Sequence, residues 1–138
     1  MSLSQLDSRE DVESFIMELK NILTSPTFNI NTDLDILPKK KSEDSLDPYT
    51  TANTLAELDY DKYDVCNQLL NIAVSDYVET ILDNKDSSFP PFFVFCKEIQ
   101  QRDVYIKVKI RDQTNGKIFC VSFHFARYSF KRPLPYEA

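Results

Sequence analysis

Apolar and polar residues alternate along residues 103–125, DVYIKVKIRDQTNGKIFCVSFHF, and this alternation predicts two β-strands of about eight residues each. The dipeptide Asn115-Gly116 separates the strands and favours a hairpin with a two-residue turn, because Asn and Gly accept the positive φ that such a turn needs. Gly116 is the only glycine of the chain. With this turn, one face of the hairpin is apolar throughout and contains the cross-strand pairs Ile110–Val121, Val108–Phe123 and Ile106–Phe125.

The opposite face of the predicted hairpin carries polar side chains, with Lys107 facing His124 across the strands. His124 is the only histidine of the chain. A shift of one residue in the pairing would turn every side chain to the other face, so the separation of apolar and polar positions supports this register. We therefore expect the functional residues on the polar face, whose members are Tyr105, Lys107, Lys109, Arg111, Ser122 and His124.

The first part of the chain contains apolar residues at helical spacing. The longest helix is predicted over about residues 8–25, where Ser8 and Asp11 resemble a capping box and Pro26 ends the helix. Its apolar stripe consists of Val12, Phe15, Ile16, Leu19, Ile22 and Leu23.

The remaining segments complete an α+β pattern. Short helices are predicted at about residues 51–58 and 61–72 and from Ser75 onward, and a further strand is predicted at 92–96. The pieces 28–30 and 34–37 predict a strand or a bend, and loops or extended segments are predicted at 38–49, 83–91 and 127–138. Residues 1–138 are therefore expected to form one α+β domain, in which N-terminal helices pack on one face of an antiparallel β-meander.

Charge is distributed unevenly along the chain, whose net charge is −6. Residues 97–138 contain nine Lys and Arg and four Asp and Glu, a net charge of +5, whereas residues 1–96 carry −11. The negative net charge of the chain argues against a protein that coats nucleic acid without specificity, but the basic C-terminal third can bind an anionic ligand locally. The alternative is that the strand lysines simply form a solvated face.

The residue types exclude several classes of site. With one glycine the chain has no Gly-rich phosphate loop, and with one histidine it has no multi-histidine metal site. Cys120 and His124 would lie about 13 Å apart along a strand, too far to bind one ion, so we expect no metal and no other cofactor. The three cysteines show no CxxC spacing, and no apolar run is long enough to cross a membrane, so we expect a cytoplasmic protein.

The polar face contains groups that can transfer protons. A lysine next to a histidine favours the neutral imidazole, so His124 suits the role of a general base, and Tyr105 and Lys107 lie on the same face. Such a cluster can cleave RNA without a metal. One group accepts the 2′-hydroxyl proton, cations stabilise charge on the phosphate, and another group protonates the leaving 5′-oxygen. The alternative is that His124 is a strand residue hydrogen-bonded to a neighbour.

From Tyr63 onward, the chain resembles the MqsR family of bacterial toxins over about residues 63–136. The resemblance rests on an ordered set of motifs, namely Gln68-Leu69-Leu70, Ser75-Asp76-Tyr77, Phe93-Val94-Phe95, Val104-Tyr105-Ile106-Lys107-Val108 and Cys120-Val121-Ser122-Phe123-His124. It implies a RelE-like α+β fold and a ribonuclease that acts on mRNA.

The resemblance also implies two catalytic residues. The family tyrosine thought to act in catalysis falls on Tyr105, and a basic residue near the C-terminus falls on His124, where the best-known members have lysine. Two further positions differ from the family, with Glu79 in place of a lysine and Phe92 in place of a glutamine. RNA phosphates are expected to contact Lys107, Lys109, Arg111 and Arg127.

We therefore expect the toxin of a toxin–antitoxin pair, a metal-independent endoribonuclease that cleaves mRNA by attack of the 2′-hydroxyl. Its partners would be mRNA and a cognate antitoxin protein that covers the cationic face, and it would not bind membranes. Glu79 and Phe92 favour the alternative, a catalytically inactive member of the fold that acts as a protein-binding module.

Overall fold

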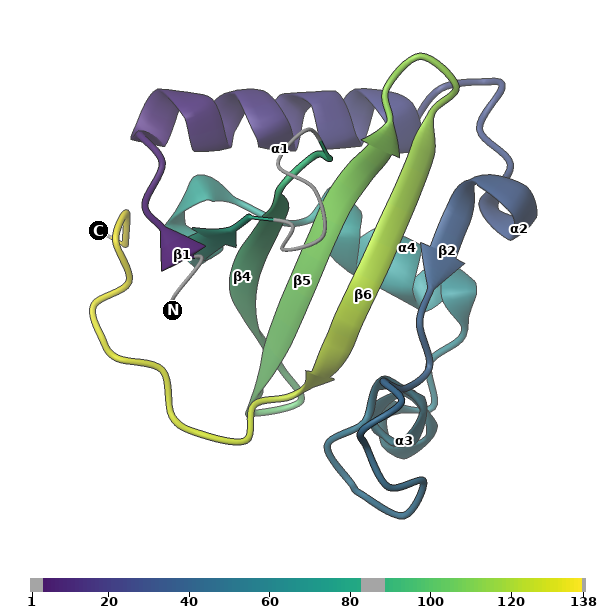
Figure 1. The fold of residues 1–138 in the computed structure, drawn as a ribbon, viewed down its shortest axis with the longest axis vertical. Coiled ribbons are helices and arrows are strands. Elements are labelled where there is room, and N and C mark those ends of the chain that lie inside the picture. Colours follow the sequence, from purple (N-terminus) through teal and green to yellow (C-terminus); the bar gives the residue numbers. More distant parts are fainter. Residues whose placement is uncertain (1–3, 83–88, 138) are drawn as a thin grey trace.

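The computed structural model describes residues 4–82 and 89–137. The chain forms a mixed α+β fold with one six-stranded sheet, in the strand order β1-β3-β4-β5-β6-β2 (Figure 1). All neighbouring strands are antiparallel except β2 and β6, which are parallel. The strands are β1 (Ser4–Gln5), β2 (Leu34–Ile36), β3 (Tyr77–Ile81), β4 (Phe92–Ile99), β5 (Arg102–Asp112) and β6 (Lys117–Phe125).

The helices α1 (Arg9–Leu23), α3 (Thr51–Leu58) and α4 (Lys62–Leu70) are close to those predicted from the apolar spacing. The short helix α2 (Ile30–Asp33) was not predicted. At the start of α1, the Ser8 side chain accepts a hydrogen bond from the backbone N–H of Asp11 at 3.1 Å, as the capping pattern predicts. In the described part of the chain, no helix is both long and apolar enough to span a membrane.

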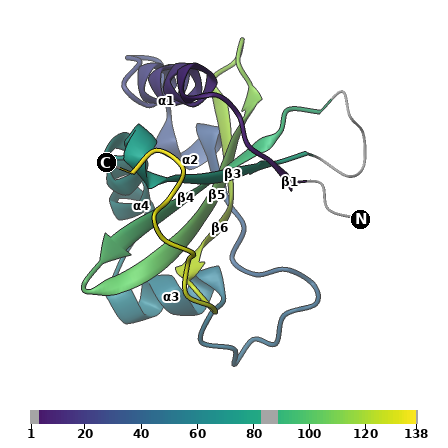
Figure 2. The same cartoon turned by 90° about the vertical axis from the view of Figure 1, so that its left-hand side faces the viewer.

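One face of the sheet is covered by α1 and α4, as the edge-on view shows (Figure 2). The ring of Phe15 in α1 stacks on that of Phe93 in β4, with 3.9 Å between ring centroids, and Val65 and Leu69 of α4 are fully buried in the same core. Each such side chain contributes about 2 kcal/mol when it leaves water. The predicted α+β class is confirmed, and the sheet is mostly antiparallel, with one parallel pair between β2 and β6.

The helix expected from Ser75 onward is wrong after its first turn. Residues Val74–Asp76 form one 3₁₀ turn, and the chain then enters β3. A bulge between Tyr77 and Glu79 breaks the period of two, so the two buried residues of β3, Tyr77 and Thr80, stand three apart. That spacing imitates a helix, which explains the incorrect prediction.

Other differences concern the ends of the sheet. The segment at 34–37 is a strand rather than a bend, and β4 continues to Ile99, beyond the predicted end at Cys96. Strand β1 was not predicted because two residues are too short to show alternation. The tail after β6 contains no helix or strand among its described residues, as predicted, and most of the loop predicted at 83–91 lies outside the described residues.

The hairpin between β5 and β6 has a different register from the predicted one. Its loop contains the four residues Gln113–Gly116, because the Asp112 carboxylate accepts hydrogen bonds from the backbone N–H and the side-chain amide of Asn115 at 3.1 and 2.8 Å. Gly116 takes the positive φ of 65°, whereas Asn115 does not. Asp112 pairs with Lys117 across this loop, and Arg111 is an extra residue in a bulge of β5, so Ile110 pairs with Ile118 and not with Val121.

A second irregularity in β6 restores the apolar face. Lys107 pairs with Ser122 and Val108 pairs with Cys120, which leaves Val121 as an extra residue in a bulge. Ile106, Val108, Ile110, Phe123 and Phe125 are buried as predicted, but Val121 is only half-buried. The prediction that Val121 faces the core is therefore wrong, because the bulge takes it out of the alternation.

The free edge of β6 is completed by a strand and then by a helix. Strand β2 pairs with Ile118 to Cys120, and beyond that point α3 takes its place. The hydroxyl oxygens of Thr51 and Thr54 accept hydrogen bonds from the backbone N–H groups of Phe123 and Phe125, each at 3.0 Å. Both threonines are buried, so these bonds fix α3 against the end of the hairpin.

Replacement of Thr54 by valine tests this contact. The shape and the β-branching stay the same, but the buried N–H of Phe125 loses its acceptor, so we expect the free energy of unfolding to fall by about 2 kcal/mol. Urea unfolding followed by circular dichroism measures the change. Thr32→Val, at an exposed position in α2, is the matched control and should change stability by less than about 0.5 kcal/mol. Equal effects of both substitutions would show that the hydroxyl of Thr54 does not stabilise the fold.

Candidate functional site

The candidate site lies on the face of the sheet turned away from α1 and α4, which we call the outer face. Figure 1 looks onto this face, with α4 behind the sheet. The pairing of β3 to β6 places one set of side chains on it, namely Glu79, Phe92, Tyr105, Lys107, Lys109, Arg111, Phe119, Ser122 and His124. All six residues expected on the polar face of the hairpin are therefore on the outer face.

Tyr105 and His124 are direct cross-strand neighbours at the end of the hairpin away from its loop. Their rings stack with 5.2 Å between centroids and 13° between planes. The predicted contact of His124 with Lys107 is wrong, because the four-residue loop shifts the pairing by two residues. The bulges at Arg111 and Val121 add one residue to each strand and cancel, so Lys107 lies opposite Ser122. The structure thus joins the two predicted catalytic residues more directly than the expected register would.

The half-buried ring of His124 is held in one tautomer. Its Nδ1 lies 3.0 Å from the backbone carbonyl oxygen of Phe125, and because a carbonyl only accepts hydrogen bonds, Nδ1 must carry the proton. In the neutral ring Nε2 then holds the lone pair. Burial lowers the pKa of His124 below its usual value, the bond to Phe125 opposes this shift, and the nearby positive charges of Lys40 and Arg127 support it. His124 is therefore neutral at pH 7 and can accept a proton.

Tyr105 has the opposite protonation behaviour. Burial, with a smaller effect from the Glu79 carboxylate, raises the pKa of its hydroxyl to about 12, so the phenol keeps its proton throughout the physiological range. The Tyr105 ring also stacks on Phe130 of the C-terminal tail, with 6.2 Å between centroids. A neutral imidazole and a protonated phenol in contact provide one proton acceptor and one proton donor.

The loop 37–50 brings further charges to His124, and the sequence interpretation did not place them there. It comes forward on the outer side of the sheet (Figure 2). Arg127 Nη2 lies 3.0 Å from a carboxylate oxygen of Glu43 and 2.5 Å from one of Asp47, and its guanidinium sits 5.3 Å from the ring centroid of Tyr49. In the sequence, the only indication of charged residues in this loop that could act on a site is the run of three lysines at 39–41.

The other predicted phosphate-binding residues follow β5 away from Tyr105. The ammonium groups of Lys107 and Lys109 lie 4.8 and 4.5 Å from the ring centroid of Phe92, and Lys109 is 7% exposed. Arg111 lies over Phe119 at 4.0 Å and forms an ion pair with Asp35. Arg111 is roughly 20 Å along the strand from Tyr105, so Lys107 and Lys109 are the nearer cations.

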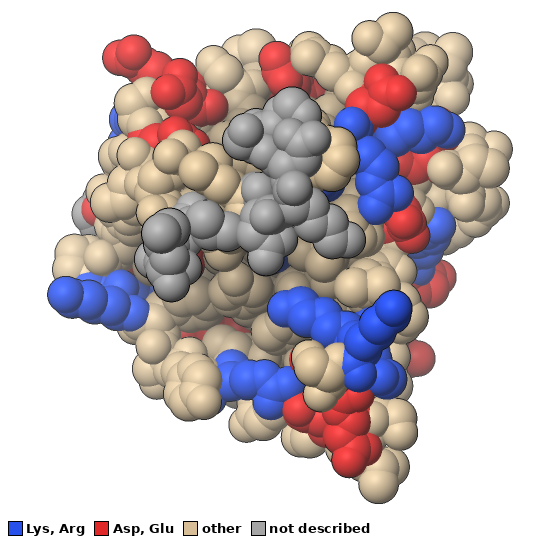
Figure 3. All heavy atoms as spheres, viewed as in Figure 1, with Lys and Arg blue, Asp and Glu red and all other residues tan. Residues whose placement is uncertain are grey.

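The cations of the outer face do not form one continuous basic surface. In Figure 3, which has the same view as Figure 1, the visible Lys and Arg side chains stand in separate groups, and Asp or Glu side chains lie beside the groups on the right-hand side. The ion pairs of Arg111 and Arg127 agree with this pattern. Where Figure 3 shows the described residues, the positive charges are therefore local, and those of Arg111 and Arg127 are balanced by carboxylates.

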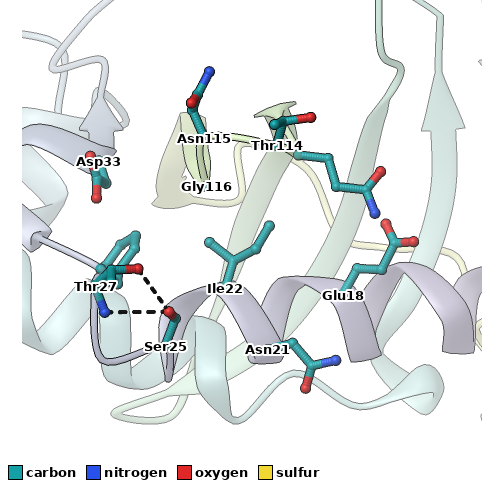
Figure 4. A pocket seen from close by; sticks show the side chains of 11 residues that line it. Glu18, Asn21, Ile22, Ser25, Thr27, Asp33, Thr114, Asn115 and Gly116 are labelled. Atoms are coloured by element: carbon teal, nitrogen blue, oxygen red, sulfur yellow. Dashed lines mark hydrogen bonds between the residues drawn. The ribbon is translucent and has the colours of Figure 1, made fainter.

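A hollow of about 360 Å³ lies at the opposite end of the hairpin from Tyr105 and His124. It is formed by the C-terminal half of α1 and the hairpin loop, with Glu18 and Ile22 on one side and Thr114 and Asn115 on the other (Figure 4). It contains none of the predicted site residues. In the described residues, no group of three His, Cys, Asp or Glu side chains is close enough to bind a metal ion.

Comparisons with known proteins add no relative. No protein-family model matches the chain, and no curated protein matches it at a significant level.

The hydroxyl of Ser122 is an unusual feature of the outer face. It is fully buried and has no hydrogen-bond partner within the described part of the chain, although it stands directly opposite Lys107. A buried hydroxyl without a partner costs about 1 kcal/mol or more of stability. A residue that lowers stability in this way is typical of a position with a functional role, so Ser122 belongs to the candidate site.

We expect Ser122→Ala to raise the free energy of unfolding by about 1 kcal/mol, because alanine removes the unpaired hydroxyl and leaves the packing of Cβ. Urea unfolding measures this change. Ser14→Ala, an exposed change on α1, is the control and should have a much smaller effect. A loss of stability in Ser122→Ala would mean that the hydroxyl does make a stabilising bond.

Proposed function

We propose that this protein is the toxin of a toxin–antitoxin pair, a metal-independent endoribonuclease with a RelE-like fold that acts on mRNA in the cytoplasm. The observation that carries the proposal is the stacked pair of His124 and Tyr105, which supplies a neutral base beside a protonated acid. The six-stranded α+β architecture and the resemblance of residues 63–136 to the MqsR family support it.

The proposed step breaks a phosphodiester bond with internal attack. Nε2 of His124 accepts the proton of the ribose 2′-hydroxyl, the 2′-oxygen forms a bond to phosphorus, and the bond from phosphorus to the 5′-oxygen breaks. The hydroxyl of Tyr105 donates its proton to the leaving 5′-oxygen. The products are a 2′,3′-cyclic phosphate and a 5′-hydroxyl end, and neither water nor a cofactor is consumed.

Cations on the same face would stabilise the charge that builds up on the phosphate. Lys107 is two residues from Tyr105 on the same side of β5 and stands opposite Ser122, so it is the cation best placed for this role. Lys109 follows one position further along the face. Arg111 and Arg127 would have to exchange their carboxylate partners for phosphate, and they are assigned to binding of the flanking RNA.

The alternative is a catalytically inactive member of the fold that binds a protein partner. The ring of Phe92 favours it, because this ring stands under the ammonium groups of Lys107 and Lys109 at the position where the family has glutamine. Glu79 also favours it, since it brings a negative charge to Tyr105. If the protein is the toxin, a cognate antitoxin is the expected partner, and it would cover the cationic part of the outer face.

Cleavage of RNA tests the proposal directly. Purified protein should cut single-stranded RNA in excess EDTA and leave 2′,3′-cyclic phosphate ends, whereas RNA with a 2′-deoxy residue at the cut site should survive. We expect His124→Ala to lower the rate ~10²–10⁴-fold through loss of the general base. Gel analysis of labelled RNA and mass spectrometry of the fragments measure these outcomes.

Tyr63→Ala is the matched control for that experiment, because Tyr63 is an exposed aromatic residue on α4, away from the outer face. It should leave the rate unchanged. Cleavage that requires Mg²⁺, or an unchanged rate in His124→Ala, would contradict the mechanism. Absence of any cleavage, together with tight binding of an antitoxin, would support the protein-binding alternative.

The pH dependence of cleavage follows from the two pKa shifts. The pKa of His124 lies below 6.5, so the base is active above that pH and the rate should fall as acid protonates it. Tyr105 keeps its proton up to about pH 12, so the rate should be level between roughly pH 7 and 9. Single-turnover rates across this range measure the profile. A maximum below pH 6 would contradict these roles.

A further inference from the structure

A second group of aromatic and cationic side chains lies where β5 begins and β6 ends. The guanidinium carbon of Arg102 stands 3.5 Å from the ring centroid of Phe125, which is a close stacking contact. Two hollows open beside this pair, one of about 580 Å³ and one of about 250 Å³, and both are lined by Arg102 and Phe125. The larger hollow also includes Leu46, and the smaller one includes Tyr128.

Arg102 differs from the other arginines in its electrostatic partners. Four arginines form ion pairs, namely Arg9 with Glu13, Arg111 with Asp35, Arg127 with Glu43 and Asp47, and Arg132 with Asp103 and Glu137. Arg102 forms no ion pair with any described residue. Among the described residues, its planar group is held by the ring of Phe125, so one face of the guanidinium is covered and the other can receive a ligand.

Tyr128 adds a second stacking surface to this position. Its side chain is 84% exposed, which is unusual for a large aromatic residue, and it lines the same hollow as Arg102. An exposed tyrosine beside an unpaired, pre-oriented guanidinium is the combination that binds unstacked bases, because bases stack on aromatic rings and on guanidinium planes alike.

We propose that Arg102 and Tyr128 bind an unpaired nucleobase of single-stranded RNA next to the cleaved phosphodiester. This inference rests on the proposed function. Arg102 lies three residues before Tyr105, about 10 Å along β5, and Phe125 directly follows His124. Arg102 is two residues before the buried Val104, and Phe125 pairs with Val104, so both turn to the opposite side of the sheet from Tyr105 and His124. The smaller hollow is lined by Arg127 as well as by Arg102 and Tyr128, so an RNA strand with its phosphate at Tyr105 and His124 would pass around this end of the sheet to bring a neighbouring base to Arg102. The base, rather than the phosphate, is the ligand, because the surface offered is a flat stacking platform.

Binding of RNA to the His124→Ala protein, which is expected to cleave far more slowly than the wild type, tests this assignment. The probe is a fluorescein-labelled single-stranded RNA of about ten nucleotides, and anisotropy gives Kd. We expect Arg102→Ala to weaken binding roughly 10- to 100-fold, the range for loss of one base stack. Arg102→Lys should restore little of this loss, because lysine keeps the charge but not the plane. Tyr128→Ala should weaken binding in the same direction, and its exposed position protects the fold.

A series of RNAs with one abasic nucleotide at successive positions identifies the bound base. One abasic position should weaken binding to the parent His124→Ala protein about as much as Arg102→Ala does, and it should cause no further loss in the Arg102→Ala background. Arg9→Ala removes an equivalent charge from α1 and is the control for net charge. It should leave Kd within twofold.

The outcomes separate the two proposals. Full rescue by Arg102→Lys, or equal binding by all abasic RNAs, would assign Arg102 to a phosphate and overturn the base site while the ribonuclease proposal stands. Unchanged binding in both Arg102→Ala and Tyr128→Ala would also overturn the base site. Absence of RNA binding by the parent protein would overturn both proposals together.

Discussion

The register between β5 and β6 is the constraint on which the candidate site depends. It is set by three local features, namely the four-residue loop with the hydrogen bonds from Asn115 to the Asp112 carboxylate, the bulge at Arg111 in β5 and the bulge at Val121 in β6. Each feature changes the count of residues on one strand, and together they place Tyr105 opposite His124. Without the bulge at Val121, the part of β6 that contains His124 would turn its other face to the core. The pairing of the two groups is therefore a consequence of backbone irregularities rather than of regular alternation.

The chain segment between β2 and α3 depends on the same edge of the hairpin. Strand β2 holds β6 by backbone pairing, and α3 holds it through the hydroxyls of Thr51 and Thr54. Because both ends of the loop 37–50 are fixed to β6, its charged residues must lie near the end of that strand. The effects of Lys40 and Glu43 on His124 follow from this closure. The electrostatic setting of the base is thus determined by a segment more than 70 residues away in the sequence.

Sequence patterns predicted the features that depend on one element at a time. The stripe of α1, the range of α3 and the separation of the hairpin into two faces all come from local spacing, and the structure contains them. The predicted pairing of Lys107 with His124 was wrong because Asn115-Gly116 predicts a two-residue turn. The structure instead forms a longer loop, in which the Asn115 side chain donates a hydrogen bond to the Asp112 carboxylate. The bulges at Val121 and Val78 have no signature in alternation, and the one at Val78 concealed strand β3. The stacking of Phe130 on Tyr105 and of Arg102 on Phe125 depends on the tertiary structure, so residue spacing could not predict it.

The cations of this face show how a site can be assembled on an acidic protein. Exposed ion pairs such as Arg111 with Asp35 contribute about 0–1 kcal/mol, so they orient the guanidinium without holding it strongly. A phosphate can replace such a carboxylate with little loss, since one anion is exchanged for another. For Arg127 the exchange would release Glu43 and Asp47, which belong to the loop beside His124. Binding of an anion and the charge around the base are therefore linked through Arg127, whereas Arg102 needs no exchange before it can receive a ligand.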